Sequence, residues 1–542
     1  MPPSIDRPVA RTPRTPRTLC SARSFRSSRR RRPGLPVGLL GLLAALSLLC
    51  GCLGAPGPAV EPLPAGSNLL LITLDTLRAD HLSSYGYPRN TSPVIDRLVA
   101  EGVRFAQPSV QWPKTGPSMA SIFTATYPKD NGIVRRIGIP LPCRFEMLAE
   151  ELRRQGYSTH AVVANGALAS DFYFDQGFDT YIETWKLEPD GAADPNRAEA
   201  VTGLAIGLLD RLSRERDEGR PFFLWVHYLD PHAPYSPPGE WSERFQGDEH
   251  WSPEPKVLIS DKPDQQMYGI GRSQVLDGHD ELAYYVARYD AEIAYNDAQV
   301  GRLLEAMTER GLLEKTLTVV TSDHGESLGD HHYYFDHGRF GFQTCLKVPL
   351  IFHYPGVLEP RVDERPVELI HLAPTLLEAA GKELPHGVWM QGRSLTPRLR
   401  GRSSGPRDPA EGAGGSLVEP SFAEHRAGYA FAEAGWEVNN RWQKVVRDDR
   451  FKLIYAQSPP EQRWIAGEGV RFALFDLERD PGETVNVAEE HPQDFERLQR
   501  VLWQWENAEP FPVEVGPLTE ACGEERTMED ETRKLLESLG YL

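Results

Sequence analysis

The sequence predicts an α/β fold with helices on both faces of a central sheet, and two patterns carry this prediction. The first is a set of short, nearly continuous apolar runs, which is typical of strands buried in a parallel sheet. The second is a set of longer segments between them with apolar residues three or four positions apart, which is typical of amphipathic helices. Strands that alternate with helices favour a doubly wound sheet. A length of 542 residues allows one large unit of this kind and a smaller one.

Each expected element follows from its own stretch of sequence. The expected strands are 69–74, 222–226, 317–321 and 349–352, and the expected helices are 94–101, 145–155, 198–215 and 281–310. Asp75 and Asp323 each stand directly after one of these strands. In a doubly wound sheet the reactive groups gather at the carboxyl ends of the strands. We therefore expect both carboxylates at one edge of the sheet.

The composition changes after residue 395, which indicates a second, smaller domain. We expect the main domain at 67–395 and a linker loop at 396–425, because this stretch is rich in Gly, Arg, Ser and Pro and has no periodicity. Residues 426–542 are expected to form an α+β subdomain with a helix at 494–505 and a tail helix at 531–539.

The first residues indicate an export signal at 1–52 followed by a tether at 53–66. Arg29–Arg32 precede an apolar run, Leu35–Leu49, which has the length of a signal peptide and is shorter than a membrane-spanning helix. Leu49-Cys50-Gly51-Cys52 looks like a bacterial lipobox, with Cys52 as the lipidated residue. We therefore expect an exported outer-membrane lipoprotein, held to the membrane by the lipid on Cys52. A secretory peptide cleaved nearby, which releases the protein into the periplasm or to the cell surface, is the alternative.

The charge of the chain argues against nucleic acid as a partner. The net charge is −18, and ten arginines and one acid in residues 1–52 leave −27 on the rest. A surface this acidic repels polyanions. An anionic substrate would therefore have to be met by a local group of cations or by a metal.

A threonine stands where a helix is expected to begin. In the segment 112–120, Pro117 fits the first turn of a helix, because its missing N–H costs nothing there. Thr115 would then lie beside the free N–H groups at the positive end of that helix. This setting suits an alkoxide nucleophile. A plain helix-capping threonine produces the same pattern.

Histidines and acids gather after two other expected strands. His227 and His232 lie in a proline-rich loop, where core packing does not explain them. Asp323 and His324 are adjacent at a strand end, and His337 follows in the same region. A carboxylate oxygen beside an imidazole nitrogen suits Zn²⁺ or Mn²⁺. Burying so many polar groups without a purpose would cost too much free energy, so the sequence predicts a metal site here.

The order of these motifs resembles the sulfatase family within the alkaline phosphatase superfamily. The matching segments are Leu-Ile-Thr-Leu-Asp75-Thr, Thr115-x-Pro-Ser, Asp-Pro-His232-x-Pro-Tyr and Ser-Asp323-His324-Gly-Glu, with weaker matches spread over residues 67–510. The resemblance implies an alkaline-phosphatase-like mixed central sheet with helices on both faces and a small carboxy-terminal α+β subdomain. It also implies one divalent metal held by Asp75, Thr115, Asp323 and His324.

Several positions depart from the family pattern. Sulfatases carry Cys-x-Pro-Ser-Arg, whose cysteine is oxidised to formylglycine, whereas this chain has Thr115 and Met119. Threonine cannot form an aldehyde hydrate, so the collapse of that hydrate cannot expel sulfate. His324 stands where calcium-binding members have asparagine, and Asn165 lies where they have a lysine and a histidine. These changes resemble phosphodiesterases and phosphoethanolamine transferases of the superfamily, which use a threonine nucleophile.

The residues and the resemblance together predict a metal-dependent hydrolase of phosphate esters, diesters above all, with Thr115 as nucleophile. We expect Zn²⁺ or Mn²⁺ rather than Ca²⁺, and the resemblance allows a second metal held by some of these residues, because the superfamily includes two-metal members. His227, His232 and His337 are expected to hold the transferred group or to protonate the leaving oxygen, and Asn165 to hydrogen-bond a free oxygen of the substrate. Three alternatives stay open: a sulfuric ester hydrolase without formylglycine, a phosphoryl transferase of the cell envelope, and a non-catalytic surface binding module.

Overall fold

The structure is a computed structural model that describes most of the chain after residue 62. The described residues are 63–134, 138–188, 194–250, 255–260, 269–381, 390–401, 428–436, 441–457, 471–508, 526–539 and 541. The expected signal peptide at 1–52, residues 53–62 of the tether and residues 402–425 of the linker lie outside them. Among the helices that are described, none is both long and apolar enough to cross a membrane.

An eight-stranded mixed sheet forms the centre of the unit Val60–Leu542. Its strand order is β12-β2-β11-β8-β1-β5-β3-β4. The strands are β1 (Asn68–Leu74), β2 (Val103–Ser109), β3 (Ser158–Val163), β4 (Thr180–Glu183), β5 (Phe222–Tyr228), β8 (Thr316–Thr321), β11 (Leu350–His353) and β12 (Arg361–Glu368). Only β11 runs against its neighbours in this sheet. The mixed sheet implied by the resemblance is confirmed.

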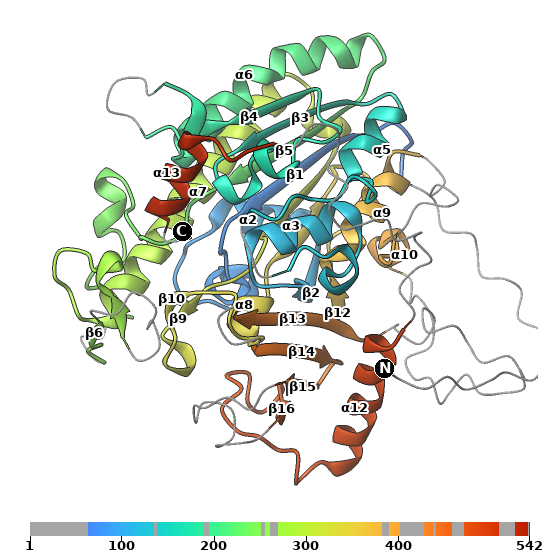
Figure 1. Cartoon of the computed structure of the whole chain (residues 1–542). Helices are drawn as coiled ribbons and strands as arrows, with labels where there is room; N and C mark the ends of the chain where they lie inside the picture. The colour runs from blue at the N-terminus through green and yellow to red at the C-terminus, as the bar shows by residue number, and fades with distance from the viewer. Residues whose placement is uncertain are drawn as a thin grey trace, which may run out of the picture. The chain divides into compact units, whose positions relative to one another are not determined.

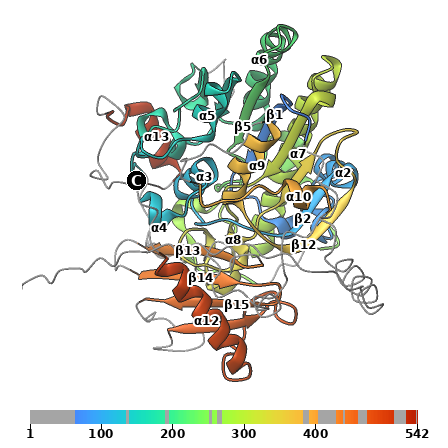
Figure 2. The same ribbon diagram turned by 90° about the vertical axis from the view of Figure 1, so that its right-hand side faces the viewer.

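Helices cover both faces of the sheet, as the alternation of strands and helices predicted (Figures 1 and 2). Side chains alternate along β1: Leu69 and Leu71 join the core under α3, α5 and α9, while Leu70 and Ile72 join the core under α2, α6 and α7. The helices are α2 (Pro93–Glu101), α3 (Thr115–Thr124), α5 (Leu148–Arg154), α6 (Ala198–Asp217), α7 (Leu282–Glu309) and α9 (Leu372–Ala379). The resulting three layers leave the strand ends as the place for polar groups.

The expected carboxy-terminal subdomain is an antiparallel sheet with one helix packed on it (Figures 1 and 2). Its elements are β13 (Ala430–Trp436), β14 (Arg441–Arg447), β15 (Phe451–Ala456), β16 (Phe472–Asp476) and α12 (Pro492–Glu506). Trp505 of α12 stacks on Phe431 of β13 with ring centroids 5.2 Å apart. The backbone N–H of Glu433 donates to the carbonyl of Gln111 at 2.9 Å, so this sheet also supports the segment before α3.

Two segments differ from the expected domain plan. Residues 396–401 were expected in the linker loop, but α10 (Thr396–Leu399) packs on the main domain, so that prediction was wrong there. Arg398 is buried because its guanidinium pairs with Asp363 at 2.8 Å, which an arginine-rich stretch does not reveal. The tail helix α13 (Asp530–Ser538) packs on the main domain and not on the small subdomain, and it lies apart from α12 in Figures 1 and 2.

Candidate active site

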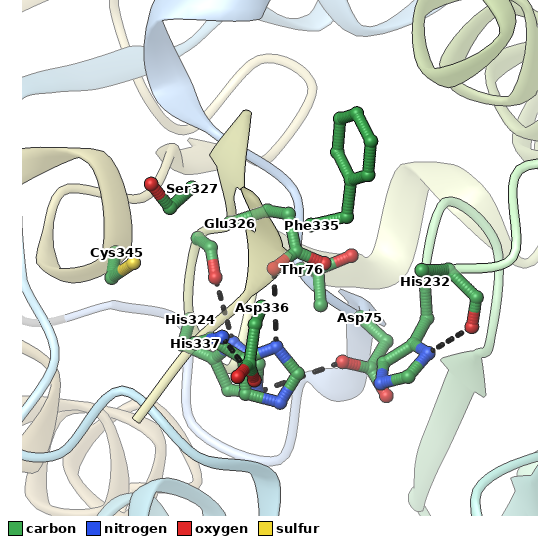
Figure 3. A network of polar contacts seen from close by, with 12 residues as sticks. Asp75, Thr76, His232, His324, Glu326, Ser327, Phe335, Asp336, His337 and Cys345 are labelled. Atoms are coloured by element: carbon green, nitrogen blue, oxygen red, sulfur yellow. Dashed lines mark hydrogen bonds and ion pairs between the residues drawn. The ribbon is translucent and has the colours of Figure 1, made fainter. Parts of the chain in front are cut away.

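The carboxyl ends of three neighbouring strands bring the predicted acids and histidines together. Strand β1 pairs in parallel with both β5 and β8, and Thr73 lies in register with His227 on one side and Thr321 on the other. Asp75 therefore emerges between the chain segments that carry His227 and Asp323. Figure 3 shows the side chains that converge around Asp75.

Asp75, Asp323 and His324 form a buried cluster that fits a divalent metal. One ligand atom from each lies within 4.8 Å of the others, and all three side chains are fully buried. Nε2 of His324 is 3.8 Å from Oδ1 of Asp75 and 3.4 Å from Oδ2 of Asp323. Neither of these two carboxylate oxygens has a hydrogen-bond partner among the described residues. Buried acceptors without partners are costly, and a cation that binds them removes the cost.

The backbone fixes the orientation of His324. Its Nδ1 lies 2.9 Å from the carbonyl oxygen of Gly325, which requires a proton on Nδ1. Nε2 then carries a lone pair that faces the two aspartates. This tautomer is the one that ligates a metal, and a carbonyl partner on the other nitrogen is the usual arrangement around such a ligand.

The remaining carboxylate oxygens are held by hydrogen bonds, so each aspartate has one fixed and one unpaired oxygen. Oδ1 of Asp323 accepts from the backbone N–H groups of His324 at 2.9 Å and Thr76 at 3.3 Å. Thr76 adopts a positive φ of 58°, which is rare for a β-branched residue and points its N–H at Asp323. Oδ2 of Asp75 accepts from Nδ2 of Asn165.

Asp75 and Asp323 both carry carboxylates, and their negative charges repel each other in this buried site. Burial alone would raise the pKa of Asp75, but the hydrogen bond with His227 and the charges of His232 and His324 hold that pKa below its usual range. Burial raises the pKa of Asp323, and the negative charge of Asp75 raises it further. Two carboxylates that share a buried site repel each other. A divalent cation would relieve this repulsion, which again fits a metal at this position.

Thr115 lies at the edge of this cluster, where the sequence predicted a nucleophile. It is the first residue of α3, is nearly fully buried, and places Oγ1 3.3 Å from Nε2 of His324. The hydroxyl of Ser118 donates to the carbonyl of Asp323 at 2.5 Å, which ties the first turn of α3 to the end of β8. The serine of Thr115-x-Pro-Ser thus positions the threonine.

Two residues that were expected to contact substrate contact Asp75 in the structure. Nδ1 of His227 is 2.8 Å from the hydroxyl of Thr73, and its Nε2 points at Oδ2 of Asp75 from 3.6 Å. Asn165 uses Nδ2 for Asp75 and Oδ1 for the backbone N–H of Ala167 at 2.8 Å. Both side chains therefore orient Asp75, which the sequence pattern could not distinguish from substrate binding.

His232 and His337 lie on the other side of the cluster, beside His324. The ring centroids of His324 and His337 are 4.1 Å apart, and those of His337 and His232 are 5.3 Å apart. Nδ1 of His337 is 3.3 Å from Oε1 of Glu326 (Figure 3). Burial lowers the pKa of His337 well below its ordinary value, and the charges of His324, His232 and Lys114 lower it further. A buried, neutral imidazole next to the cluster is suited to proton transfer.

Tyr541 also lies in the site, although no motif in the sequence pointed to it. Its phenolic hydroxyl lies 2.8 Å from Nε2 of His232, at the far end of the chain from every other site residue. Burial raises the pKa of Tyr541 well above its ordinary value, and the charge of Asp75 adds to the shift. The amphipathic tail helix before it indicated that the tail docks somewhere, but nothing in the sequence indicated where.

Comparison with models of protein families decides the family. The family described as "Sulfatase" matches residues 67–382, which is more than half of the chain and includes all of the site residues except Tyr541. The chain belongs to the sulfatase family.

The chain is similar to proteins whose names differ in the chemistry that they describe. The chain is 27% identical over 470 residues to a choline-sulfatase of Rhizobium meliloti, covering 78% of this chain and 82% of that one. It is 25% identical over 492 residues to a multifunctional alkaline phosphatase superfamily protein, PehA, of Trinickia caryophylli, covering 78% and 91%. A phosphonate monoester hydrolase of Agrobacterium radiobacter has the same fold, with a TM-score of 0.59, 24% identity and coverage of 81% and 95%.

These matches make this chain an ester hydrolase of the sulfatase family. Enzymes of the family bind a divalent metal, and the cluster of Asp75, Asp323 and His324 is the group in the described residues that fits one.

Proposed function

We propose that the protein is a metal-dependent phosphate ester hydrolase, acting on diesters above all, with Thr115 as its nucleophile. The observation that carries the proposal is the position of Thr115: its Oγ1 lies 3.3 Å from Nε2 of His324, at the amino-terminal end of α3 and beside two unpaired carboxylate oxygens. The free N–H groups of a helix start stabilise the oxyanions of a group under attack.

The side chain of Thr115 supports phosphate over sulfate. A threonine can attack phosphorus and form a phosphothreonine, but it cannot form the aldehyde hydrate that releases sulfate in formylglycine enzymes. The similarity to a phosphonate monoester hydrolase and to PehA is consistent with phosphorus chemistry. The choline-sulfatase and arylsulfatase relatives favour the alternative, a sulfuric ester hydrolase, so the assay must include both kinds of ester.

We propose Asp75, Asp323, His324 and Thr115 as the residues that would hold Zn²⁺ or Mn²⁺. A mixed oxygen and imidazole ligand set suits these ions better than Ca²⁺. Such an ion, when bound, lowers the pKa of a hydroxyl and polarises a phosphoryl oxygen. Asn165 and His227 hold Asp75 in place from behind.

In the first step, Thr115 gives up its hydroxyl proton to solvent and its Oγ1 bonds to phosphorus. The bond from phosphorus to the leaving oxygen breaks, and that oxygen departs with the bonding pair. It takes a proton from the imidazole of His232, which would have to be in its protonated form at this point and which lies next to His337. In the second step, water adds to phosphorus, the bond from Thr115 breaks, and the proton of the water returns to the imidazole. Thr115 regains a proton from solvent.

A panel of esters tests the proposed function. Purified protein is loaded with Zn²⁺ or Mn²⁺ and assayed with an aryl phosphodiester, an aryl phosphomonoester and an aryl sulfate. The proposal predicts turnover of the diester that exceeds turnover of the sulfate. Preference for the sulfate would establish the alternative, and no turnover of any ester with either metal would contradict both.

We propose in addition that the protein is exported and anchored by a lipid on Cys52, since the segment around Cys52 looks like a lipobox. Labelled palmitate should enter the wild-type protein, and the Cys52→Ala variant should lose the label. Equal labelling of both would contradict the anchor.

A further inference from the structure

The last residues of the chain enter the candidate active site. Besides the contact of its hydroxyl with His232 at 2.8 Å, Tyr541 packs its ring edge-on against the rings of His232 and His337, with centroids 5.4 Å and 6.2 Å away. Burial raises the pKa of this hydroxyl, and hydrogen bonding from the side chains of Thr115 and Asn165 acts in the opposite direction, which places both side chains within reach of it. Tyr541 thus touches the proposed nucleophile, a residue that supports a metal ligand, and a candidate acid.

The tail is built into the main domain at several points. Leu535 and Leu536 of α13 are buried in the core and lie against Gly166, where an added Cβ would come within 3.2 Å of Leu535. Gly166 directly follows Asn165, so the helix packs against the chain segment that holds Asp75. The indole N–H of Trp185 donates to the hydroxyl of Thr532 at 3.3 Å, a third buried point of attachment.

Further contacts fix the two ends of α13. At its start, the backbone N–H of Glu529 donates to Asp171 at 3.0 Å, and the Glu529 carboxylate pairs with Lys186 at 2.8 Å. At its end, the backbone N–H of Tyr541 donates to the carbonyl of Leu536 at 2.8 Å. Tyr541 is therefore held in the site by a helix with its own buried side chains, and not by the contact with His232 alone.

The hydrogen bonds of His232 define what the Tyr541 hydroxyl does in the free protein. Nδ1 of His232 lies 2.7 Å from the carbonyl of Ala233, so that nitrogen carries the proton. With Nε2 unprotonated the Tyr541 hydroxyl donates to it, and with Nε2 protonated the hydroxyl accepts from it and has its own proton free for another acceptor. A hydroxyl can rotate towards a better acceptor. An anionic ester oxygen beside Thr115 is a stronger acceptor than a neutral imidazole.

The position of Thr115 defines where that anionic oxygen would be. A tetrahedral phosphoryl or sulfuryl group under attack by Oγ1 must have its central atom next to Thr115, and its unreacted oxygens fall among the groups around Thr115. The Tyr541 hydroxyl is one of those groups. It brings a donor to a site whose nearest carboxylates, Asp75 and Asp323, would repel such an anion.

We propose that Tyr541 is a substrate-binding residue whose hydroxyl donates a hydrogen bond to an oxygen of the tetrahedral anion held at Thr115, with α13 as one wall of the active site. This inference rests on the proposed function, and it adds to it that the site is incomplete without the end of the chain. The recognised group is a tetrahedral oxyanion, whether phosphate or sulfate.

Two variants test this role in the metal-loaded full-length protein. Tyr541→Phe removes only the hydroxyl, and deletion of residues 540–542 removes the side chain but keeps α13. Loss of a hydrogen bond to a charged group lowers kcat/KM and phosphate affinity by roughly tenfold to a hundredfold. We expect both variants to show this loss in ester hydrolysis and in competitive inhibition by inorganic phosphate, with the melting temperature unchanged for Tyr541→Phe.

Tyr429→Phe is the matched control, because it removes a phenolic hydroxyl that contacts Arg497 in the carboxy-terminal subdomain. It should leave hydrolysis and phosphate inhibition as in the wild type. Unchanged kinetics in Tyr541→Phe would overturn the inference. Faster hydrolysis after deletion of residues 540–542 would also overturn it, since it would identify the tail as a plug that substrate has to displace.

A direct binding measurement separates failure of this inference from failure of the proposed function. Calorimetric titration of the Zn²⁺-loaded protein with inorganic phosphate needs no turnover. Weaker phosphate binding by Tyr541→Phe than by wild type supports the inference even if the hydrolysed ester is a different one. Equal binding by the two proteins contradicts it while the ester panel can still support Thr115. If the wild type neither binds phosphate nor hydrolyses any ester, both proposals are wrong.

Discussion

Oγ1 of Thr115 lies 3.3 Å from Nε2 of His324, although the two residues are 209 positions apart in the sequence. Thr115 begins α3, and His324 follows β8. The bond from Ser118 to the carbonyl of Asp323 joins these two elements directly. The proposed nucleophile and the proposed metal ligand are therefore positioned by the start of a buried helix and by the segment that directly follows a buried strand.

Replacement of Thr115 should separate its chemical role from its structural one. We expect Thr115→Ala to lower kcat by at least about a thousandfold, because removal of a nucleophile commonly costs that much or more. Thr115→Ser keeps a hydroxyl at the same place and should retain activity within about tenfold of wild type. Steady-state hydrolysis of the best ester in the panel measures both effects.

Thr308→Ala is the control for this pair, since it removes the hydroxyl of a threonine that hydrogen-bonds only within α7, to the carbonyl of Leu304 at 2.8 Å. It should leave kcat unchanged. Full activity in Thr115→Ala would show that the nucleophile is another group.

The substitution Asp323→Asn is expected to raise the stability of the metal-free protein and to lower the stability that added metal provides. In Asp323→Asn, an amide N–H replaces the unpaired Oδ2 that lies 3.4 Å from the lone pair of His324 Nε2. Without metal, the variant loses a repulsive charge and gains a hydrogen bond, so it should be more stable than wild type by about 1 kcal/mol or more. With Zn²⁺ at a hundred times its Kd, wild type should gain about 2.7 kcal/mol that the variant lacks.

Thermal unfolding with chelator measures the expected gain in stability without metal, and thermal unfolding with added Zn²⁺ measures the expected loss of metal-induced stability. The Asp210→Asn variant changes the same kind of side chain at an exposed position beside Arg310 and should respond to Zn²⁺ as the wild type does. A wild-type melting temperature that is insensitive to Zn²⁺, Mn²⁺ and chelator would argue against a metal at Asp75, Asp323 and His324.

How much could be predicted from the sequence depends on how locally each feature is encoded. Strands β1, β5, β8 and β11 are short apolar runs and could be recognised. Strands β2 and β12 could not, because the first contains Pro108 and the second has four charged residues among the five that precede Pro366. Helices with long amphipathic patterns, such as α6 and α7, were found almost to the residue.

The site residues can likewise be divided into those that local sequence predicts and those whose position or contacts depend on the tertiary fold. Asp75, Asp323 and His324 could be predicted because residues directly after buried strands must gather at one edge of the sheet. The direction in which a side chain points is not encoded locally, so His227 and Asn165 were assigned to substrate and not to Asp75. The position of Tyr541 depends on where α13 packs. That packing is set by Trp185, Gly166 and other residues more than 300 positions away in the sequence.

The hydrogen bond from Asn165 to Asp75 predicts a loss of metal affinity when it is removed. Groups that orient a metal ligand typically contribute about 10- to 100-fold in metal affinity or activity. We therefore expect Asn165→Ala to weaken Zn²⁺ binding within that range, which competition with a zinc-chelating dye measures. Asn507→Ala is the control, because Asn507 bonds only a helix carbonyl at an exposed position. Unaltered Zn²⁺ affinity in Asn165→Ala would mean that Asp75 is held by His227 alone.

A buried carboxyl far from the strand ends predicts how stability depends on pH. Asp297 of α7 accepts the backbone N–H groups of Val94 and Ile95 at 2.9 Å and 2.8 Å, at the start of α2. Burial nevertheless raises the pKa of Asp297 to about 7. Because the unfolded pKa is about 3.9, the folded protein binds more protons at this residue between these two values. Its contribution to stability is therefore complete below about pH 4 and is lost as the pH rises through about 7.

The difference between wild type and Asp297→Asn isolates this contribution, because all other titrating groups are shared. The stability of wild type relative to the variant should fall by up to about 4 kcal/mol between pH 4 and pH 7.5, since each unit of pKa shift corresponds to about 1.4 kcal/mol. Urea unfolding at several pH values in this range measures it. A difference that stays constant with pH, or that grows in favour of wild type, would show that the two N–H donors keep Asp297 ionised and that they outweigh its burial.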